Sequence, residues 1–160
     1  MLLDGKQLGH YRILHVIGSG GMGEVYLAED SRVHRQVAAK VVQVEAALAN
    51  NEGVTHALRL FLREATAIAR LDHPNILPLY DYGEEIVETT RIAYLITPYR
   101  PEGSLVTWLH QQAVNQQKQQ ITLKQVAHLL QQAAEALQYA HDRQIIHQDV
   151  KPSNFLIRVK

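Results

Sequence analysis

The sequence predicts an α+β fold in two parts, with short antiparallel strands in the first part and helices in the second. Apolar and polar residues alternate over 24–29, and residues 11–17 and 91–97 are rich in β-branched and aromatic side chains, as strands are. From 126 to 140, apolar residues recur at the three- and four-residue spacing of a helix. The stretch 98–103, which contains two prolines and a glycine, separates the two patterns and is the expected hinge.

The strand-rich part is expected to contain five strands. A glycine cluster at 18–23 lies between the first two strand patterns, so they should form an antiparallel hairpin. The apolar run 37–42 predicts a third strand. Runs 76–82 and 91–97 predict two more, joined by the acidic segment 83–90, which reads as a flexible loop.

Three helices are expected. Apolar residues at helical spacing predict one over 61–69, and Pro74 should prevent it from continuing. Residues 105–109 predict a short second helix, which the glutamine-rich run 111–120 either extends or follows as a loop. The third helix, over 122–141, begins with Thr122 and Gln125 spaced as a capping box.

The composition fits a soluble globular domain. The 160 residues are 46% hydrophobic and 20% charged, which argues against disorder. Lys plus Arg and Asp plus Glu number 16 each, so no basic excess indicates nucleic acid or an anionic membrane as partner. The absence of cysteine excludes disulfides and thiolate metal sites. No apolar run reaches the roughly 20 residues that a membrane-spanning helix needs, and a cytoplasmic location is expected.

The glycine run Gly18 to Gly23 (GSGGMG) has the spacing of a phosphate-binding loop, although taken alone it could equally be a plain hairpin turn. A dinucleotide-binding fingerprint would open a helix, whereas a strand pattern follows here. A Walker loop would carry Lys-Ser or Lys-Thr after its last glycine, where this chain has Glu24. A strand–glycine–strand flap, whose backbone can approach a triphosphate closely, is the remaining nucleotide-binding form.

Lys40 interrupts the apolar run 37–42. An unpaired charge buried in a strand is costly, so this ammonium group should have a partner. A bound anion would supply one. The alternative is a solvated lysine at the edge of the sheet.

The most specific pattern lies near the C-terminal end, where residues His147 to Asn154 read HQDVKPSN. It combines a carboxylate, a cation and an amide at fixed offsets. Together with the glycine run and with Lys40 in the sequence Val-Ala-Ala-Lys, it resembles the protein kinase family, in the form found in serine/threonine kinases. The run from Gly18 to Tyr26 is most similar to bacterial members of that family.

The resemblance implies ATP-dependent phosphoryl transfer to serine and threonine hydroxyls of protein substrates, with Mg²⁺. Asp149 would accept the proton of the attacking hydroxyl, Lys151 would neutralise charge on the transferring group, and Asn154 would hold Mg²⁺. Lys40 would contact the phosphates of ATP and pair with Glu64 on the helix that follows it. His147 is expected to be structural. The remaining nucleotide-binding residues implied are Gly18, Ser19, Gly20, Gly21 and Gly23 over the phosphates, Val25, Ala38 and Leu156 around the adenine, and Thr97, Pro98 and Arg100 at the gatekeeper and hinge.

The same resemblance implies a two-lobed kinase-like fold. Its parts would be an N-terminal extension (1–10), a strand-rich N-lobe with one regulatory helix (11–97), a hinge (98–103), and the first helices and catalytic loop of an incomplete C-lobe (104–160). No Asp-Phe-Gly run follows in the 160 residues, which predicts weak or absent activity for this stretch by itself. A non-catalytic nucleotide-binding or protein-interaction module is the alternative.

Two further expectations follow from departures within the pattern. Gln148 stands where the family commonly has an arginine that docks a phosphorylated activation loop, so control by that route is in doubt. The apolar stripe of the helix over 122–141 should be partly uncovered, to be covered by a partner or a further C-terminal segment.

Overall fold

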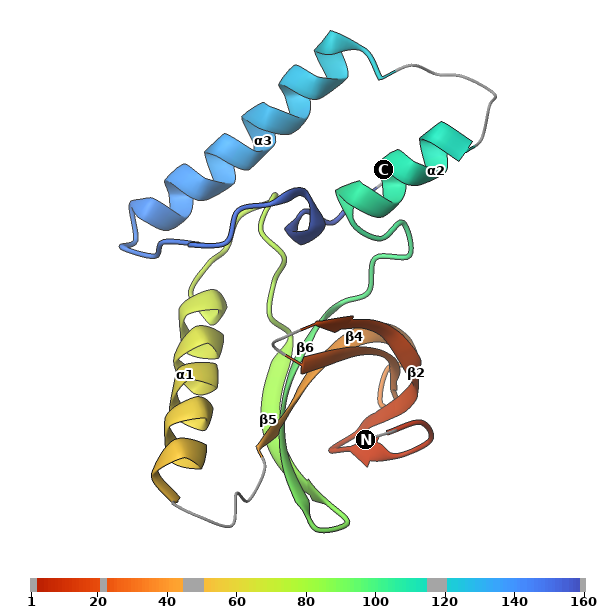
Figure 1. Ribbon diagram of the computed structural model, residues 1–160, viewed down its shortest axis with the longest axis vertical. Coiled ribbons are helices and arrows are strands. Elements are labelled where there is room, and N and C mark those ends of the chain that lie inside the picture. The colour runs from red at the N-terminus through yellow and green to blue at the C-terminus, as the bar shows by residue number, and fades with distance from the viewer. Residues whose placement is uncertain (1–2, 21–22, 45–50, 115–120, 159–160) are drawn as a thin grey trace. The chain divides into compact units, whose positions relative to one another are not determined.

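The computed structural model describes residues 3–20, 23–44, 51–114 and 121–158, and it confirms the α+β class (Figure 1). The chain forms two compact units. The first comprises Met1–Leu71 and Leu77–Tyr99, and the second comprises Asp72–Ile76 and Arg100–Lys160. The change of unit after Tyr99 falls within the predicted hinge at 98–103.

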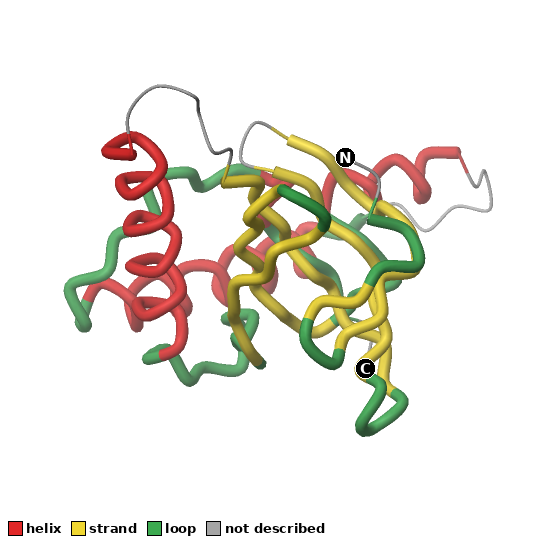
Figure 2. Tube along the Cα trace, turned by 90° about the horizontal axis from the view of Figure 1, so that it is seen from below, coloured by secondary structure: helices red, strands yellow, loops and turns green. Residues whose placement is uncertain are grey.

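The first unit is built on one antiparallel sheet of six strands in the order β1-β2-β3-β4-β6-β5. Its strands are the yellow segments of the tube in Figure 2. Its strands are β1 (Gln7–Leu8), β2 (Tyr11–Gly20), β3 (Gly23–Asp30), β4 (Arg35–Val44), β5 (Asp81–Val87) and β6 (Thr90–Pro98). The strands predicted over 11–17, 24–29, 37–42 and 91–97 are therefore confirmed. Successive side chains along a strand point to opposite faces of a sheet, and each face of this sheet carries its own hydrophobic cluster.

The N-terminal residues are an integral part of this sheet. Leu3 and Leu8 are fully buried in the inner hydrophobic cluster, and β1 pairs with β2. Side chains also link this segment to β5, at the opposite end of the strand order. The links are Lys6 Nζ to Glu88 Oε1 (3.0 Å), the Gly9 amide to Glu85 Oε2 (3.2 Å) and the Tyr11 hydroxyl to Asp81 Oδ2 (2.9 Å). The two ends of the sheet therefore approach each other, and the inner cluster is enclosed.

Replacing Leu8 with alanine should destabilise the first unit substantially. The side chain has 0% exposure, so its removal leaves a cavity as well as losing transfer free energy. We expect the free energy of unfolding to fall by about 2–5 kcal/mol in a urea titration. Val33→Ala, at a site with 61% exposure, is the control and should change it by less than about 0.5 kcal/mol. Equal effects of the two substitutions would contradict the burial of the N-terminal segment.

Helix α1 (Asn51–Ala69) packs on the outer face of the sheet (Figure 1). Phe61 and Ala65, one helical turn apart, are buried against Ala93 and Leu95 of β6. This is the helix predicted over 61–69, and it ends at Ala69, ahead of Pro74, as expected. It begins ten residues earlier than the apolar spacing alone predicted.

The strand predicted over 76–82 is wrong, as is the flexible loop predicted over 83–90. The strand is β5 (Asp81–Val87), and only a tight turn at Glu88 and Thr89 separates it from β6. Pro78 lacks an amide hydrogen and interrupts any ladder over 76–80. In β5 the alternation between the two faces falls on acidic residues. Glu85 accepts from the Gly9 amide, and its neighbour Glu84 is exposed.

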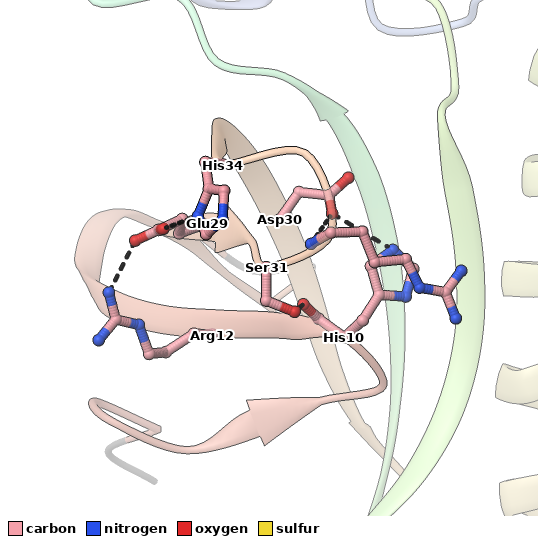
Figure 3. Close-up of polar contacts among 7 residues, drawn as sticks. His10, Arg12, Glu29, Asp30, Ser31 and His34 are labelled. Atoms are coloured by element: carbon pink, nitrogen blue, oxygen red, sulfur yellow. Dashed lines mark hydrogen bonds and ion pairs between the residues drawn. The ribbon is translucent and has the colours of Figure 1, made fainter.

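The turn between β3 and β4 is fastened to β2 by polar contacts (Figure 3). Arg12 donates to Glu29 (2.7 Å), and this bond, with the contact from His34, lowers the pKa of the Glu29 carboxyl. Asp30 is buried and lies 3.6 Å from His10 Nε2, while the Ser31 hydroxyl donates to the backbone carbonyl of His10 (2.7 Å). These contacts fix the hairpin end remote from the glycine run.

The second unit contains helices α2 (Leu105–Val114) and α3 (Leu123–His141) and the short 3₁₀ helix η1 (Pro152–Asn154). The capping box is confirmed, since Thr122 Oγ1 accepts from the Gln125 amide (3.2 Å) and Gln125 Oε1 accepts from the Thr122 amide (2.8 Å). Part of the glutamine-rich run extends α2, and the rest, 115–120, lies outside the described residues.

The apolar stripe of α3 is partly uncovered, as the spacing predicted. Leu123 and Leu130 are 89% and 66% exposed, whereas Ala140 is buried near the end of the helix. There the loop Asp72–Ile76 is held by α3, because the Asp72 amide donates to the Tyr139 hydroxyl (3.2 Å) and the His73 ring lies 5.0 Å from that of Tyr139. Among the helices that the structure describes, none is both long and apolar enough to cross a membrane.

Candidate active site

The glycine run lies in the β2–β3 hairpin, as predicted. Gly18 pairs with Val25, Ser19 with Glu24, and Gly20 with Gly23. Gly21, which was expected to take part in nucleotide binding, lies outside the described residues.

The structure distinguishes between these glycines. At Gly23 the backbone has a φ of +118°, and an added Cβ would lie 2.3 Å from the carbonyl oxygen of Val41. At Gly18 an added Cβ would make only an ordinary 3.9 Å contact with Val25, and at Gly20 no described atom lies within 4 Å. The fold therefore requires glycine at 23, whereas packing in the first unit does not explain Gly18 and Gly20.

We expect Gly23→Ala to destabilise the first unit by about 3 kcal/mol, because it combines an unfavourable φ with a clash against the backbone of β4. The matched substitution Gly20→Ala should change the free energy of unfolding by less than about 1 kcal/mol. Thermal or urea unfolding of the two variants measures the difference. A Gly23→Ala variant as stable as Gly20→Ala would show that the backbone at residue 23 is not held as described.

Four of the predicted nucleotide-binding residues share one face of the sheet. Cross-strand neighbours lie on the same face, as do residues two apart along a strand. Val25 is in register with Lys40, and Ala38 is in register with Thr97. Since Ala38 and Lys40 are two residues apart, all four side chains lie on the face against which α1 packs.

Lys40 has the partner that its place in an apolar strand demands. Its Nζ lies 3.7 Å from Glu64 Oε1 on α1, and both side chains are partly exposed. Ion pairs of this kind contribute at most about 1 kcal/mol to stability. The contact therefore adds little to the stability of the fold.

The cluster that fixes α1 on the sheet is the part of the site that sequence reasoning missed. Phe61 and Ala65 flank Glu64, and they pack against Leu95, which is the cross-strand neighbour of Lys40. The position of the carboxylate relative to the ammonium group therefore depends on this apolar contact. The i, i+4 spacing of Phe61 and Ala65 around Glu64 is the sequence signal that could have indicated this cluster.

In the second unit, the loop after α3 brings together two predicted catalytic residues, Asp149 and Lys151, and the predicted metal ligand Asn154. Lys151 Nζ lies 2.8 Å from Asp149 Oδ2. The Asn154 amide nitrogen donates to the backbone carbonyl of Asp149 (2.8 Å) and to its Oδ2 (3.0 Å). Pro152 begins the 3₁₀ turn that brings Asn154 back toward Asp149.

These contacts stabilise the ionised form of the Asp149 carboxyl. The hydrogen bond from Lys151, followed by that from Asn154, lowers the pKa of the Asp149 carboxyl below its usual value. A lowered pKa in the folded chain means that the carboxylate persists to lower pH than in the unfolded chain, so it is fully ionised at neutral pH. An ionised carboxylate can orient a hydroxyl and accept its proton.

The backbone around Asp149 is also constrained. Its amide donates to His147 Nδ1 (3.2 Å), so the ring nitrogen that accepts must be unprotonated. This contact agrees with the structural role expected for His147. Gln148, between them, has a φ of +62°, a left-handed conformation that non-glycine residues seldom adopt.

The remaining predicted residues are divided between the two units. Thr97 and Pro98 end β6 in the first unit. Arg100 and Leu156 belong to the second unit, where the Arg100 carbonyl accepts from the Gly103 amide (3.1 Å) and Leu156 forms a β-bridge with Ser104.

The donor set for a metal ion is small. Within the described residues, no three His, Asp or Glu side chains are grouped so as to hold a metal by themselves. The amide nitrogen of Asn154 is used in its two bonds to Asp149, which leaves its side-chain oxygen as a hard ligand. Mg²⁺ is commonly bound by one or two such groups with phosphate oxygens completing the shell, so these residues fit it only in company with a nucleotide.

Comparison with known proteins agrees with this fold and site. The protein kinase domain model matches residues 11–160, and the chain therefore belongs to the protein kinase family. It is 38% identical over 157 residues to the serine/threonine-protein kinase PrkC of Bacillus subtilis, covering 98% of this chain. It is 35% identical over 147 residues to the serine/threonine-protein kinase PknB of Mycobacterium tuberculosis, covering 92% of this chain.

A solved structure, the kinase domain of PknI from Mycobacterium tuberculosis, superposes with a TM-score of 0.69 at 28% identity over 96% of this chain. The match spans 57% of that kinase-domain chain. The chain spans 22% of the length of PrkC and of PknB. It thus corresponds to part of a kinase domain, as the sequence predicted.

Proposed function

We propose that the protein transfers the γ-phosphoryl group of ATP to serine and threonine hydroxyls of protein substrates. The observation that carries this proposal is the loop in which Lys151 and Asn154 both hold the carboxylate of Asp149. A carboxylate, a cation and a metal-binding amide within six residues are the groups that phosphoryl transfer needs. The names of the relatives, all serine/threonine-protein kinases, support the choice of acceptor.

In this proposal Asp149 orients the substrate hydroxyl and accepts its proton as the new O–P bond forms and the bond to ADP breaks. Lys151 leaves Asp149 to neutralise charge on the transferring group. Asn154 would hold Mg²⁺ through its side-chain oxygen, and the ion would neutralise the phosphate charge. In the protein kinase family a second carboxylate, from an Asp-Phe-Gly run, also binds Mg²⁺.

Nucleotide binding is proposed for the sheet face that carries Lys40. The ammonium group, held by Glu64, contacts the phosphates, while the backbone at Gly18, Ser19, Gly20, Gly21 and Gly23 lies over them. Packing leaves Gly18 and Gly20 unexplained, which supports a close approach of ligand to backbone there. The adenine is proposed to contact Val25, Ala38 and Leu156, with Thr97, Pro98 and Arg100 at the gatekeeper and hinge.

The organisation of the chain fits the same proposal. Residues 11–97 correspond to the N-lobe and 104–160 to the first part of the C-lobe, with the hinge at 98–103. We further propose a cytoplasmic location, where ATP is available, and a partner or further protein segment that covers the exposed stripe of α3. Gln148 stands in place of the arginine that docks a phosphorylated loop in the family, so we do not propose control by that route.

The test is transfer from ATP labelled at the γ-phosphate to a general protein acceptor by the full-length gene product, followed by phosphoamino-acid analysis. Label on serine or threonine is the expected result. Label confined to tyrosine would contradict the proposed acceptor. Saturable nucleotide binding without any transfer would instead indicate a non-catalytic nucleotide-binding module.

A further inference from the structure

The first residues of strand β3 alternate between the two faces of the sheet. Val25 lies on the face of Lys40, whereas Glu24 and Tyr26, on either side of it, lie on the inner face. Across this inner face the Tyr26 hydroxyl donates to Glu24 Oε2 at 2.5 Å. The bond thus spans Val25 and joins the first residue after the glycine run to the buried core.

Tyr26 is a firm anchor for such a bond. Its side chain is 1% exposed, in the inner cluster that also contains Leu3 and Leu8. The hydroxyl also makes a hydrogen bond with the backbone of Leu3. Burial, and then the bond to Glu24, raises the pKa of Tyr26 to about 12, so the hydroxyl keeps its proton and remains a donor at neutral pH.

The β2–β3 hairpin has little side-chain packing near the glycine run. Val16 and Ile17 are exposed, and the β2–β3 register shifts between Val16 and Gly18. Side-chain packing is sparse at Gly18 and Gly20. The backbone ladders to β2 and β4 hold β3 at this point, and the part-buried bond between Tyr26 and Glu24 is the side-chain restraint that the inner face adds to them.

We propose that Tyr26 and Glu24 are positioning residues for nucleotide binding. Their hydrogen bond holds the root of the glycine hairpin and sets Val25 on the face of Lys40, and the segment 3–8 holds Tyr26 in turn. That segment precedes the region that the kinase domain model matches, residues 11–160. The inference deepens the proposed function, and its effect on nucleotide affinity rests on that function. Its effect on the hairpin can be measured without nucleotide.

Tyr26→Phe removes the hydroxyl and keeps the buried ring. We expect the amides of Ser19, Glu24 and Val25 to exchange with solvent about five- to tenfold faster, as the loss of one buried hydrogen bond implies. The dissociation constant of a non-hydrolysable ATP analogue should rise by a similar factor. Glu24→Gln retains an acceptor oxygen and should behave nearly as the wild type, whereas Glu24→Ala should reproduce Tyr26→Phe.

Tyr82→Phe, on β5 and 49% exposed, is the matched control and should change neither quantity. Unchanged exchange at the hairpin in both Tyr26→Phe and Glu24→Ala would overturn the inference. So would faster exchange spread evenly to the β5–β6 amides, because that would indicate a general loss of stability. If Tyr26→Phe does not fold, Glu24→Ala decides by the same criteria, since the Glu24 side chain is only half-buried.

The two proposals fail in different ways. A wild-type chain that binds no ATP analogue would contradict the proposed function, and hydrogen exchange alone would then decide whether the Tyr26–Glu24 bond orders the hairpin. A wild-type chain that binds the analogue with the same affinity as Tyr26→Phe would leave the function standing and would refute the positioning role.

Discussion

Asp149→Asn is expected to lower phosphoryl transfer by the full-length gene product by about 10³-fold, within the range that general-base groups contribute. Asparagine preserves the size of the side chain and an oxygen for the Asn154 amide to donate to, but it cannot accept the proton of the hydroxyl. Nucleotide affinity should remain within about twofold, because the substitution leaves the sheet face of Lys40 untouched. Initial rates and nucleotide titrations on the same preparation measure both quantities.

Asp142→Asn is the matched control. Asp142 is an exposed carboxylate at the C-cap of α3, and it accepts a hydrogen bond from Gln138 at 2.7 Å. It should transfer phosphate at the wild-type rate. Transfer by Asp149→Asn at a rate close to that of the control would show that another residue is the base.

Lys40→Ala is expected to weaken the binding of Mg·ATP by about 10- to 100-fold, since it removes a charge-assisted contact with the phosphates. The fold should persist, because Lys40 is partly exposed and its ion pair with Glu64 is long, at 3.7 Å. Isothermal titration of the chain with a non-hydrolysable ATP analogue measures the change. Glu64→Gln should have a smaller effect in the same direction, because it leaves the ammonium group in place.

Lys6→Ala provides the comparison for Lys40→Ala. Lys6 also belongs to the first unit and pairs with a carboxylate, Glu88, at 3.0 Å. Its removal should leave the affinity unchanged. A Lys40→Ala variant that binds as tightly as Lys6→Ala would refute the phosphate-binding role.

Local patterns in the sequence were sufficient where neighbouring residues determine the structure. The hairpin around the glycine run and the start of α3 were predicted correctly, because turn glycines and a capping box act within a few residues. The strand near residue 80 was misplaced, since an apolar run that contains Pro78 looked more like a strand than the acidic residues of β5 did. Asp81 and Glu85 find their hydrogen-bond partners in Tyr11 and Gly9, which are far away in the sequence. A local pattern could not indicate this pairing.

The candidate site also contains contacts that are local in the sequence and contacts that depend on tertiary packing. Asp149, Lys151 and Asn154 lie within six residues, so their spacing alone was enough to predict that they would meet. The approach of Glu64 to Lys40 depends on how α1 packs on the sheet, so only the family resemblance predicted it. The different reasons for glycine at 20 and at 23 could not be predicted, because they depend on the carbonyl of Val41 in another strand.

The central claim is that the sheet face with Lys40, Val25 and Ala38 binds ATP. Methyl NMR spectra of the chain, recorded during a titration with Mg²⁺ and a non-hydrolysable ATP analogue, test it most directly. The account predicts saturable shifts of the Val25 and Ala38 methyl signals, with the signals of Val33, at the β3–β4 turn, unchanged. Absence of saturable shifts, or shifts of Val33 without those of Val25 and Ala38, would contradict it.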